Sequence, residues 1–566
     1  MADARGEPYL QDWPLRPWLL AGFLALFGLA IHLLTQGHHD SAARVAAAGF
    51  FFFGGIAFAL CLLREKWLEP AVFAAVIGVV MGGLAYHVVE LDGRVAGEQF
   101  SFSAGIVSTL LALPLFQAGF HRSRFATPYR DTHFHLWSDA ISGAGALAFV
   151  GLSWLLLLVL ASLFGLLKID LLKDLMDEGW FGWMFSGAAL GGALGVLRNE
   201  LGVLGTLQQV VMAVFAILAV PLAAALVLFF IAVAVSGLDV LWEATRNATP
   251  LLLASAAGSF ILANAIVRDA DDAMSRSRIQ RIAAMVLVLG ILPLSLFAAV
   301  SMGLRIEQHG LSPERIWALI AIAVAVAYGL AGLVVVVRGR MAGWSGLLRR
   351  ANLNLAVGVS AIALLLALPI LDFGALSTRN QLARLSSGAV SADDFDYDAL
   401  RWDFGEAGRE ALAKLVKSDN ARIAELAGEA QAAESRPWLG RGERRPGAAR
   451  LANLHSDIAD PVLLEAVRRE IRKHGWVCEE ACTALDLGTD EKQRRRVAIV
   501  AGNDVSHYIL APSGDLEGFY SLMPGDETPS AAANAAPLSG KPAVEIRTET
   551  IRRIFVNGRP VGQPFK

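Results

Sequence analysis

The stretch LGTLQQVVMAVFAILAVPLAAALVLFFIAVAVSGL, residues 204–238, contains no Lys, Arg, Asp or Glu. A helix that crosses the roughly 30 Å hydrocarbon core of a bilayer needs about 20 apolar residues. The stretch is therefore long enough for one tilted span, or for two short segments divided at Pro221. Proline lacks a backbone donor, so Pro221 should kink a continuous helix. The stretch predicts a chain that folds in a membrane.

Ten further stretches have the same apolar character. They are Trp18–Leu34, Val45–Leu63, Ala71–Val89, Ser103–Phe120, Ile141–Leu167, Trp180–Leu197, Pro250–Val267, Ala283–Leu304, Ile316–Val337 and Leu353–Leu371. Together with Leu204–Leu238 they predict eleven transmembrane helices. The composition agrees, because a chain that is 55% hydrophobic and 18% charged has too little polar surface for a soluble globule.

The chain changes character after Asp372. Residues 373–566 carry 26 of the 49 Lys and Arg in about half as many residues as the apolar part. The sequence therefore predicts a multi-span transmembrane domain at residues 1–372 and a soluble domain at residues 373–566. The fold class is an all-α polytopic membrane protein with a C-terminal soluble α+β domain.

The soluble domain is expected to be helical first and sheet-like last. Val390–Leu415 is predicted to be a helical unit, Asp419–Ala433 a helix, and Ser435–Gly447 a loop. Asp460 is predicted to cap a helix that begins at Pro461 and ends at Lys473. The predicted strands are Arg495–Val500, His507–Leu510, Gly518–Leu522 and Ala543–Arg547, followed by a hairpin around Asn557–Gly558.

The basic residues of the connecting segments orient the chain. One side of the membrane receives sixteen Lys and Arg, which are Arg5, Arg16, Arg64, Lys66, Arg122, Arg124, Arg130, Arg198, Arg268, Arg276, Arg278, Arg281, Arg338, Arg340, Arg349 and Arg350. The other side receives seven, which are Arg44, Arg94, Lys168, Lys173, Arg246, Arg305 and Arg315. By the positive-inside rule the first side is the cytoplasm, so the N-terminus is cytoplasmic. An odd number of spans then places the tail outside, which is the periplasm in a bacterial cell.

Four loop and helix segments carry a family resemblance. They are GWFGWMFSGAALGGALGVL (179–197), RIEQHGLSPERIWALIAI (305–322), LDFGALSTRNQLARL (371–385) and FDYDALRWDFGEAGREALAKL (395–415). Their order and spacing resemble the bacterial multi-span inner-membrane family known as domain of unknown function 4153, over most of Arg130–Lys417. The resemblance implies the fold and an inner-membrane location. It implies no reaction and no catalytic residues.

Cys478 and Cys482 lie in the predicted soluble domain. The periplasm is oxidising, which favours a disulfide between them. On a regular helix, however, side chains four residues apart are about 5–6 Å apart at Cβ, more than the roughly 3.8 Å that a disulfide prefers. The bond therefore requires a turn or distorted helix end at Glu479–Ala481. A disulfide and two packed thiols both remain open.

The densest polar cluster beside the membrane is YRDTHFHLWSDA, residues 129–140. His133, His135 and Asp139 are candidate metal ligands, and His135 and Asp139 share one face of a helix. Two histidines two residues apart need a strand or a turn to act together, and the segment straddles the predicted helix start. A capped, solvated helix entry is the favoured interpretation, and no metal or other cofactor is predicted.

Uncharged polar residues are sparse within the predicted spans. Gln208, Gln209, Asn264 and Tyr328 are the candidates for deep positions, where polar groups are costly and often functional. If the protein is a transporter or handles lipids, we expect the first three to converge on a polar cavity. If it is a membrane-embedded polyprenyl-phosphate-sugar glycosyltransferase, we expect Asp40 to act as a base above an outer groove. The first outer loop is short for a sugar site.

The sequence therefore leaves three functions in order of preference. The first is a non-enzymatic scaffold or sensor for processes of the cell envelope, the second a transporter or lipid-handling protein, and the third the glycosyltransferase. The lipid bilayer is the expected partner, and an unidentified protein could contact the soluble tail. Nucleic acid is not expected, because the net charge is -3 and no basic stripe dominates.

Overall fold

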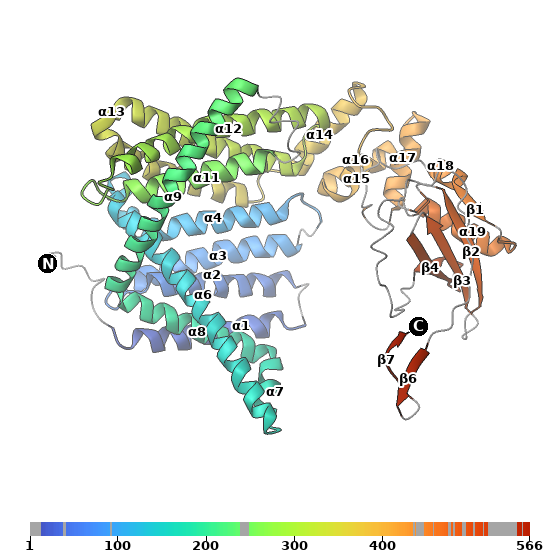
Figure 1. The fold of residues 1–566 in the computed structure, drawn as a ribbon, viewed down its shortest axis with the longest axis horizontal. Coiled ribbons are helices and arrows are strands. Elements are labelled where there is room, and N and C mark those ends of the chain that lie inside the picture. The colour runs from blue at the N-terminus through green and yellow to red at the C-terminus, as the bar shows by residue number, and fades with distance from the viewer. Residues whose placement is uncertain are drawn as a thin grey trace. The chain divides into compact units, whose positions relative to one another are not determined.

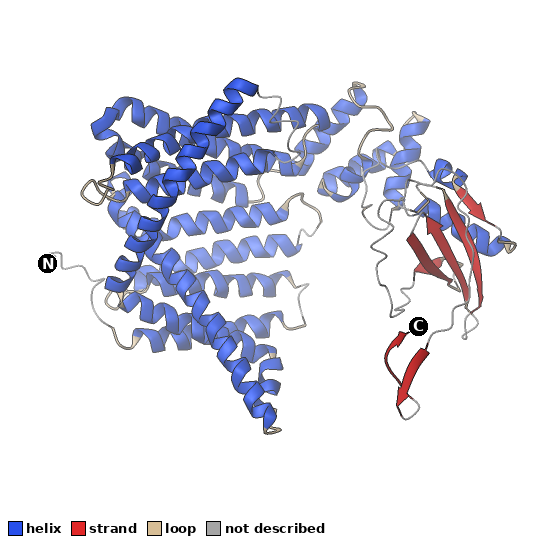
Figure 2. Cartoon of the chain, viewed as in Figure 1, coloured by secondary structure: helices blue, strands red, loops and turns tan. Residues whose placement is uncertain are grey.

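A computed structural model of the protein describes residues 13–37, 41–90, 93–237, 248–433, 436, 447–456, 458–473, 477–478, 481–489, 494–501, 504–512, 514–518, 552–556 and 559–565. The chain divides into two compact units (Figure 1). The first comprises Met1–Gln381 with Asp403–Ala407, and the second Leu382–Trp402 with Gly408–Lys566. All the described strands belong to the second unit (Figure 2).

In the described part of the chain, eleven helices are long and apolar enough to cross a membrane, which confirms the predicted number. Each of them overlaps one predicted stretch. They are α1 (Arg16–Thr35), α2 (Ala42–Cys61), α3 (Leu68–Glu90), α4 (Glu98–Gln117), α6 (Tyr129–Leu166), α8 (Gly179–Asn199), α9 (Leu201–Ser236), α11 (Ala248–Val267), α12 (Arg278–His309) and two segments of α13 (Pro313–Ala367).

Three of these helices differ in detail from the sequence-based expectation. The helix α9 continues through Pro221 as a single element, which removes the alternative of two short segments. The helix α13 contains two spans, Pro313–Arg340 and Gly343–Ala367, because Arg340 adopts φ 50° and breaks the helical path. The helix α6 begins at Tyr129, well before the predicted start at Ile141. The polar cluster at residues 129–140 is therefore helical throughout.

Glycines hold α1 and α8 in backbone contact. Gly187, Gly191 and Gly195 recur every four residues and form one stripe along α8. A Cβ atom on Gly191 would lie 2.1 Å from the carbonyl oxygen of Leu20, and one on Gly187 would lie 2.2 Å from the carbonyl oxygen of Leu24. Only glycine permits so close an approach, as is typical of small residues between membrane helices.

The first unit contains two buried apolar clusters. One is centred on α1, α2, α3 and α8, and the other on α9, α11, α12 and α13. The helix α4 packs against the second segment of α13, where Ser108 and Ser360 each donate a hydroxyl hydrogen bond to the other's backbone carbonyl, at 2.9 and 3.1 Å. Figure 1 shows α1–α4 as a row of helices that α6 and α9 cross diagonally.

Shorter helices complete the described chain. Those between or just after the spans are α5 (Phe120–Ser123), η2 (Arg124–Ala126), α7 (Leu171–Asp177) and α14 (Phe373–Ser386). Those that follow are α15 (Tyr397–Trp402), α16 (Gly405–Leu415), α17 (Ala421–Ala432), α18 (Gly447–Ala452) and α19 (Pro461–Lys473). As predicted, Asp460 caps α19, because its carboxylate accepts the backbone N–H of Val462 at 2.9 Å.

The second unit contains a five-stranded sheet in the order β1-β2-β3-β4-β5. Its strands are β1 (Leu454–Ser456), β2 (Cys482–Thr489), β3 (Arg495–Ala501), β4 (Asp504–Leu510) and β5 (Leu516–Gly518). The pair β1–β2 is parallel and the other pairs are antiparallel. Leu463, Val467 and Ile471 of α19 are fully buried in one apolar cluster with residues of the sheet. The predicted α+β fold of the C-terminal part is thereby confirmed.

The strand predictions succeed where the sequence alternates or carries a turn signal. The predicted strands at Arg495–Val500 and His507–Leu510 correspond to β3 and β4. The strands β6 (Arg552–Val556) and β7 (Arg559–Phe565) form the predicted hairpin, with Val556 paired to Arg559. The strands β1 and β2 are not predicted from the sequence pattern. The residues of β2, CTALDLGT, are not typical strand formers, so its pairing with β3 decides its conformation.

Several predicted elements of the C-terminal part lie partly or wholly outside the described residues, or differ in extent from the structure. The predicted strand Ala543–Arg547 lies outside the described residues, as does most of the loop Ser435–Gly447. The strand β5 ends at Gly518, and the residues after it up to Leu522 are likewise outside the described part. The predicted helical unit at Val390–Leu415 comprises two helices, α15 and α16.

Candidate functional site

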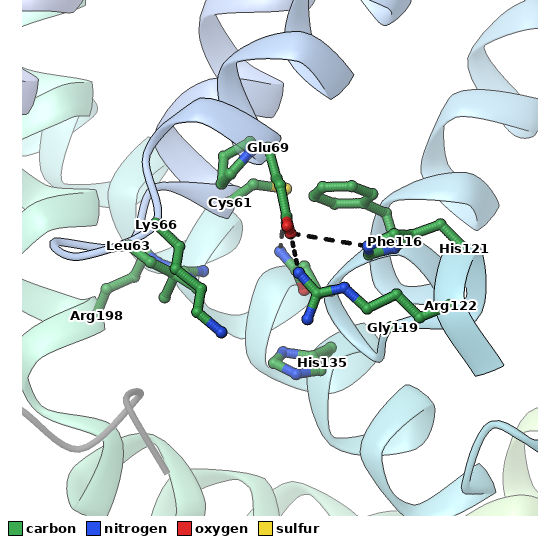
Figure 3. A pocket seen from close by; sticks show the side chains of 12 residues that line it. Cys61, Leu63, Lys66, Glu69, Phe116, Gly119, His121, Arg122, His135 and Arg198 are labelled. Atoms are coloured by element: carbon green, nitrogen blue, oxygen red, sulfur yellow. Dashed lines mark hydrogen bonds and ion pairs between the residues drawn. The ribbon is translucent and has the colours of Figure 1, made fainter.

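A cavity of about 80 Å³ lies at one end of the first unit, where α2 and α4 end and α6 begins (Figure 3). We call it the basic cavity. Three cationic side chains but only one carboxylate line it, along with two histidines. The lining residues are Cys61, Leu63, Lys66, Glu69, Pro70, Phe116, Gln117, Gly119, His121, Arg122, His135 and Arg198. A space of this size between polar groups has room for several water molecules.

The deepest charge of the cavity belongs to an ion pair. Arg198, the penultimate residue of α8, donates from Nη1 to Oδ1 of Asp139 on α6 at 3.3 Å. Their side chains are only 9% and 12% exposed. Isolated charges would be very costly at such burial, so each partner offsets the desolvation of the other. The pair therefore fixes the N-terminal part of α6 to the end of α8.

Neighbouring helices add polar contacts to this ion pair. Arg16, the first residue of α1, donates from Nη1 to the backbone carbonyl of Arg198 at 2.9 Å. Gln117, the last residue of α4, hydrogen-bonds Asp139 and also donates to the carbonyl of Leu60 at 3.0 Å. Polar side chains thus join the ends of five helices, α1, α2, α4, α6 and α8, around the basic cavity.

The outer rim of the cavity is charged and more exposed. In Figure 3 the carboxylate of Glu69 faces both Arg122 and His121. The Nε2 atom of His121 lies 3.8 Å from that carboxylate. Both Glu69 and Arg122 are about half exposed, so their ion pair contributes little to stability.

A second polar cluster lies around Arg349 in α13. Its guanidinium donates to the backbone carbonyls of Val267 at 2.8 Å and Arg268 at 3.0 Å, and to Oδ1 of Asp271 at 2.8 Å. These carbonyls end α11, where a cation is favourable because the helix dipole is negative there. The hydrogen bonds from Arg349 and Ser345 lower the pKa of Asp271 below its ordinary value. Arg349 therefore caps α11 with its side chain.

The predicted intramembrane polar residues do not form one network. Asn264 accepts a hydrogen bond from Asn352 at 2.7 Å and donates to the carbonyl of Phe260 at 2.8 Å. Gln208 is half-buried and Gln209 is exposed on α9. Tyr328 packs edge-on against Phe260, with ring centroids 4.9 Å apart. The hydrogen bonds of the described residues do not join the glutamines to Asn264.

The three candidate metal ligands share α6 but not one direction. His133 and His135 are two residues apart on a continuous helix, so their side chains project about 200° apart. His135 and Asp139 lie toward Arg198, whereas His133 packs near Tyr129 and Trp137. Among the described residues, no group of three His, Cys, Asp or Glu side chains is placed to hold a metal ion. Asp40, the glycosyltransferase candidate, lies outside the described residues.

The sequence pattern does not predict the pairing of Asp139 with Arg198. It assigns Arg198 to the positive-inside charges and Asp139 to the candidate metal ligands. A signal was present, because Asp139 stands just before the predicted span Ile141–Leu167 and Arg198 directly after Trp180–Leu197, on the same side of the membrane. Asp139 lies within α6, because this helix extends past it to Tyr129.

Cys478 and Cys482 are joined by a disulfide in the structure, with Cα atoms 5.3 Å apart. Neither residue is helical: Cys478 lies in a turn with φ 59°, and Cys482 begins β2. Both are fully buried against α19 in the apolar cluster of the second unit. The regular helix that argued against the bond is therefore absent here. Cys61 is a buried free cysteine beside Gln117.

Comparison with known proteins gives one match. The family described as "Domain of unknown function (DUF4153)" matches residues 18–415. No curated protein and no solved structure matches the chain. The matched region includes all eleven candidate spans except the first residues of α1, together with α14, α15 and α16. The chain is a multi-pass membrane protein that belongs to the DUF4153 family.

Proposed function

We propose that this protein resides in a bacterial inner membrane, with its N-terminus in the cytoplasm and its second unit in the periplasm. The sixteen-to-seven distribution of Lys and Arg supports this orientation. The eleven spans carry the chain to the opposite side. The disulfide between Cys478 and Cys482 agrees, because disulfides persist in oxidising compartments.

The role that fits best is a non-enzymatic scaffold or sensor of the cell envelope. The observation that carries it is the use of the buried polar groups of the first unit. Asp139 with Arg198, Asn264 with Asn352, and Arg349 with the end of α11 all link one helix to another. Side chains engaged in this way give a rigid membrane anchor that displays the second unit.

We expect the second unit to be exported. Alkaline phosphatase fused after Lys566 should be active, because this enzyme folds only in the periplasm, and a fluorescent protein exported by the general secretory route should be dark there.

In the same cells, Cys478 and Cys482 should resist thiol reagents under denaturing conditions until a reductant is added. An inactive phosphatase fusion together with a fluorescent protein fusion that emits light would show the opposite orientation. Full labelling without reductant would show that the cysteines are packed thiols.

The scaffold role can be separated from transport by complementation. In cells that lack the native gene and are grown under envelope stress, a chain with Asn264→Leu and Asn352→Leu should rescue as well as the unchanged protein. Replacing both partners of a buried hydrogen bond with apolar groups of similar shape is nearly neutral for stability. A chain truncated after Lys417 keeps the first unit and should not rescue, because it lacks most of the second unit.

The opposite pattern would identify a transporter. In that case the truncated chain rescues, and the double leucine variant fails although its amount in the membrane is normal. The single variant Asn352→Leu is the control for a folding defect. It leaves the side-chain amide oxygen of Asn264 buried without the hydrogen bond from Asn352. A lipid-handling role is the second candidate, and the basic cavity is the observation that favours it.

A further inference from the structure

We propose that the basic cavity binds the phosphate group of an anionic ligand, with Arg198 and Lys66 as its main contacts. This inference rests on the cavity alone and not on the scaffold role. It holds for a phosphate carried by a membrane lipid and for a soluble phosphate, and the experiment below distinguishes these sources.

The charge of the lining favours an anion. Among the formally charged residues that line the cavity, Lys66, Arg122 and Arg198 are cationic and only Glu69 is anionic. Glu69 is already paired with Arg122, and Asp139 is paired with Arg198 behind the cavity wall. Lys66 forms no ion pair with the described residues, so its ammonium group is available. The cavity therefore carries positive charge in excess of its internal partners, which disfavours a cation as its occupant.

Arg198 provides a buried donor that its partner does not exhaust. The residue is 8% exposed, and its side chain lines the cavity. A guanidinium has five N–H donors. Asp139 accepts from Nη1, whereas Nε has no hydrogen-bond partner among the described residues. Nε itself is covered by protein, so Arg198 contributes to the cavity through the charge of its guanidinium and the N–H groups that Asp139 does not use.

The size and position of the cavity define the ligand further. A space of about 80 Å³ suits a phosphate-sized group. Leu63, Pro70 and Phe116 form apolar walls beside the charged residues. The cavity lies at the ends of five candidate spans, α2, α3, α4, α6 and α8, the level at which lipid headgroups meet a membrane protein. Basic pockets between membrane helices are suited to anionic headgroups, and Arg with Lys is a common phosphate-binding pair.

The test measures thermal stability of the full chain in a neutral detergent at constant ionic strength. The two probes are inorganic phosphate and phosphatidylglycerol, with chloride and a diacylglycerol of the same acyl chains as blanks. A ligand that binds only the folded state raises the unfolding midpoint with concentration. We expect Lys66→Met to weaken this response about tenfold, because a hydrogen bond to a charged group is lost. Lys66→Arg should retain it.

Arg64→Met is the matched control. Arg64 belongs to the same connection between α2 and α3, is exposed, and does not line the cavity, so its loss removes the same charge without touching the site. Its response should equal that of the unchanged protein. A response to phosphatidylglycerol alone assigns a lipid headgroup, and a response to inorganic phosphate assigns a soluble source. No response to either probe, or equal losses in Lys66→Met and Arg64→Met, would overturn the proposal.

Discussion

Gly191→Ala is expected to lower the free energy of unfolding of the first unit by about 3 kcal/mol or more. Overpacking in a well-packed core costs about 1–3 kcal/mol when side chains can move aside. Here the new methyl group would meet backbone, because its Cβ would lie 2.1 Å from the carbonyl oxygen of Leu20 and 2.5 Å from its carbonyl carbon. The helices α1 and α8 must therefore separate, and the neighbouring contacts at Gly187 and Gly195 loosen with them.

The measurement is thermal unfolding of the purified chain in detergent, followed by tryptophan fluorescence and by the folded fraction on size exclusion. Gly192→Ala is the control on the same helix. A Cβ there would lie 3.7 Å from the Cβ of Ala21, which is ordinary contact. Its stability should stay level or rise, because alanine is favoured over glycine within a helix by about 0.5–1 kcal/mol. Equal midpoints for the two variants would contradict the glycine contact.

Removing one partner of the ion pair between Asp139 and Arg198 should have an effect of similar size. Asp139→Leu leaves the Arg198 guanidinium buried without its counter-charge, and Arg198→Met does the same to the carboxylate. Losing one partner of a buried ion pair costs about 3–5 kcal/mol. We expect each single variant to reduce the thermal midpoint and the amount of protein in the membrane.

The double variant distinguishes an ion pair from two independent packing roles. With Asp139→Leu and Arg198→Met together, no charge is left unpaired, and an apolar pair of similar volume is often as stable as the ion pair it replaces. The hydrogen bond from Arg16 survives, because it ends on the backbone carbonyl of residue 198. The double variant should therefore recover most of the lost stability. Losses that simply add would contradict the pairing.

The sequence predicts the membrane fold well because each span must meet a local requirement. About twenty consecutive apolar residues are needed to cross the hydrocarbon core, and this condition can be read without knowing any neighbour. All eleven candidate spans are predicted in this way, and the apolar stretch of α9 is sufficient by itself to identify that helix. The cap at Asp460 and the hairpin between β6 and β7 are local in the same sense.

The boundaries were harder to predict because partners set them. The polar residues before Ile141 look like a solvated helix entry, yet α6 extends through them. Asp139 can lie within that helix because Arg198, 59 positions away along the chain, supplies its counter-charge. The strand β2 similarly takes its conformation from β1 and β3 and not from its own residues. Neither partner is visible in a local stretch of sequence.

The sequence by itself determined the fold class of the protein, a polytopic helical part with a C-terminal α+β part, and the number of candidate spans. Hydrophobicity and turn chemistry act over short stretches, so they leave a readable pattern. Only the tertiary structure decided that Lys66, Arg122, Arg198 and His135 line one cavity, and that Gly191 touches the backbone of α1. These contacts join helices that are distant in sequence, and packing geometry fixes them, because side chains from different helices meet only after the helices have assembled.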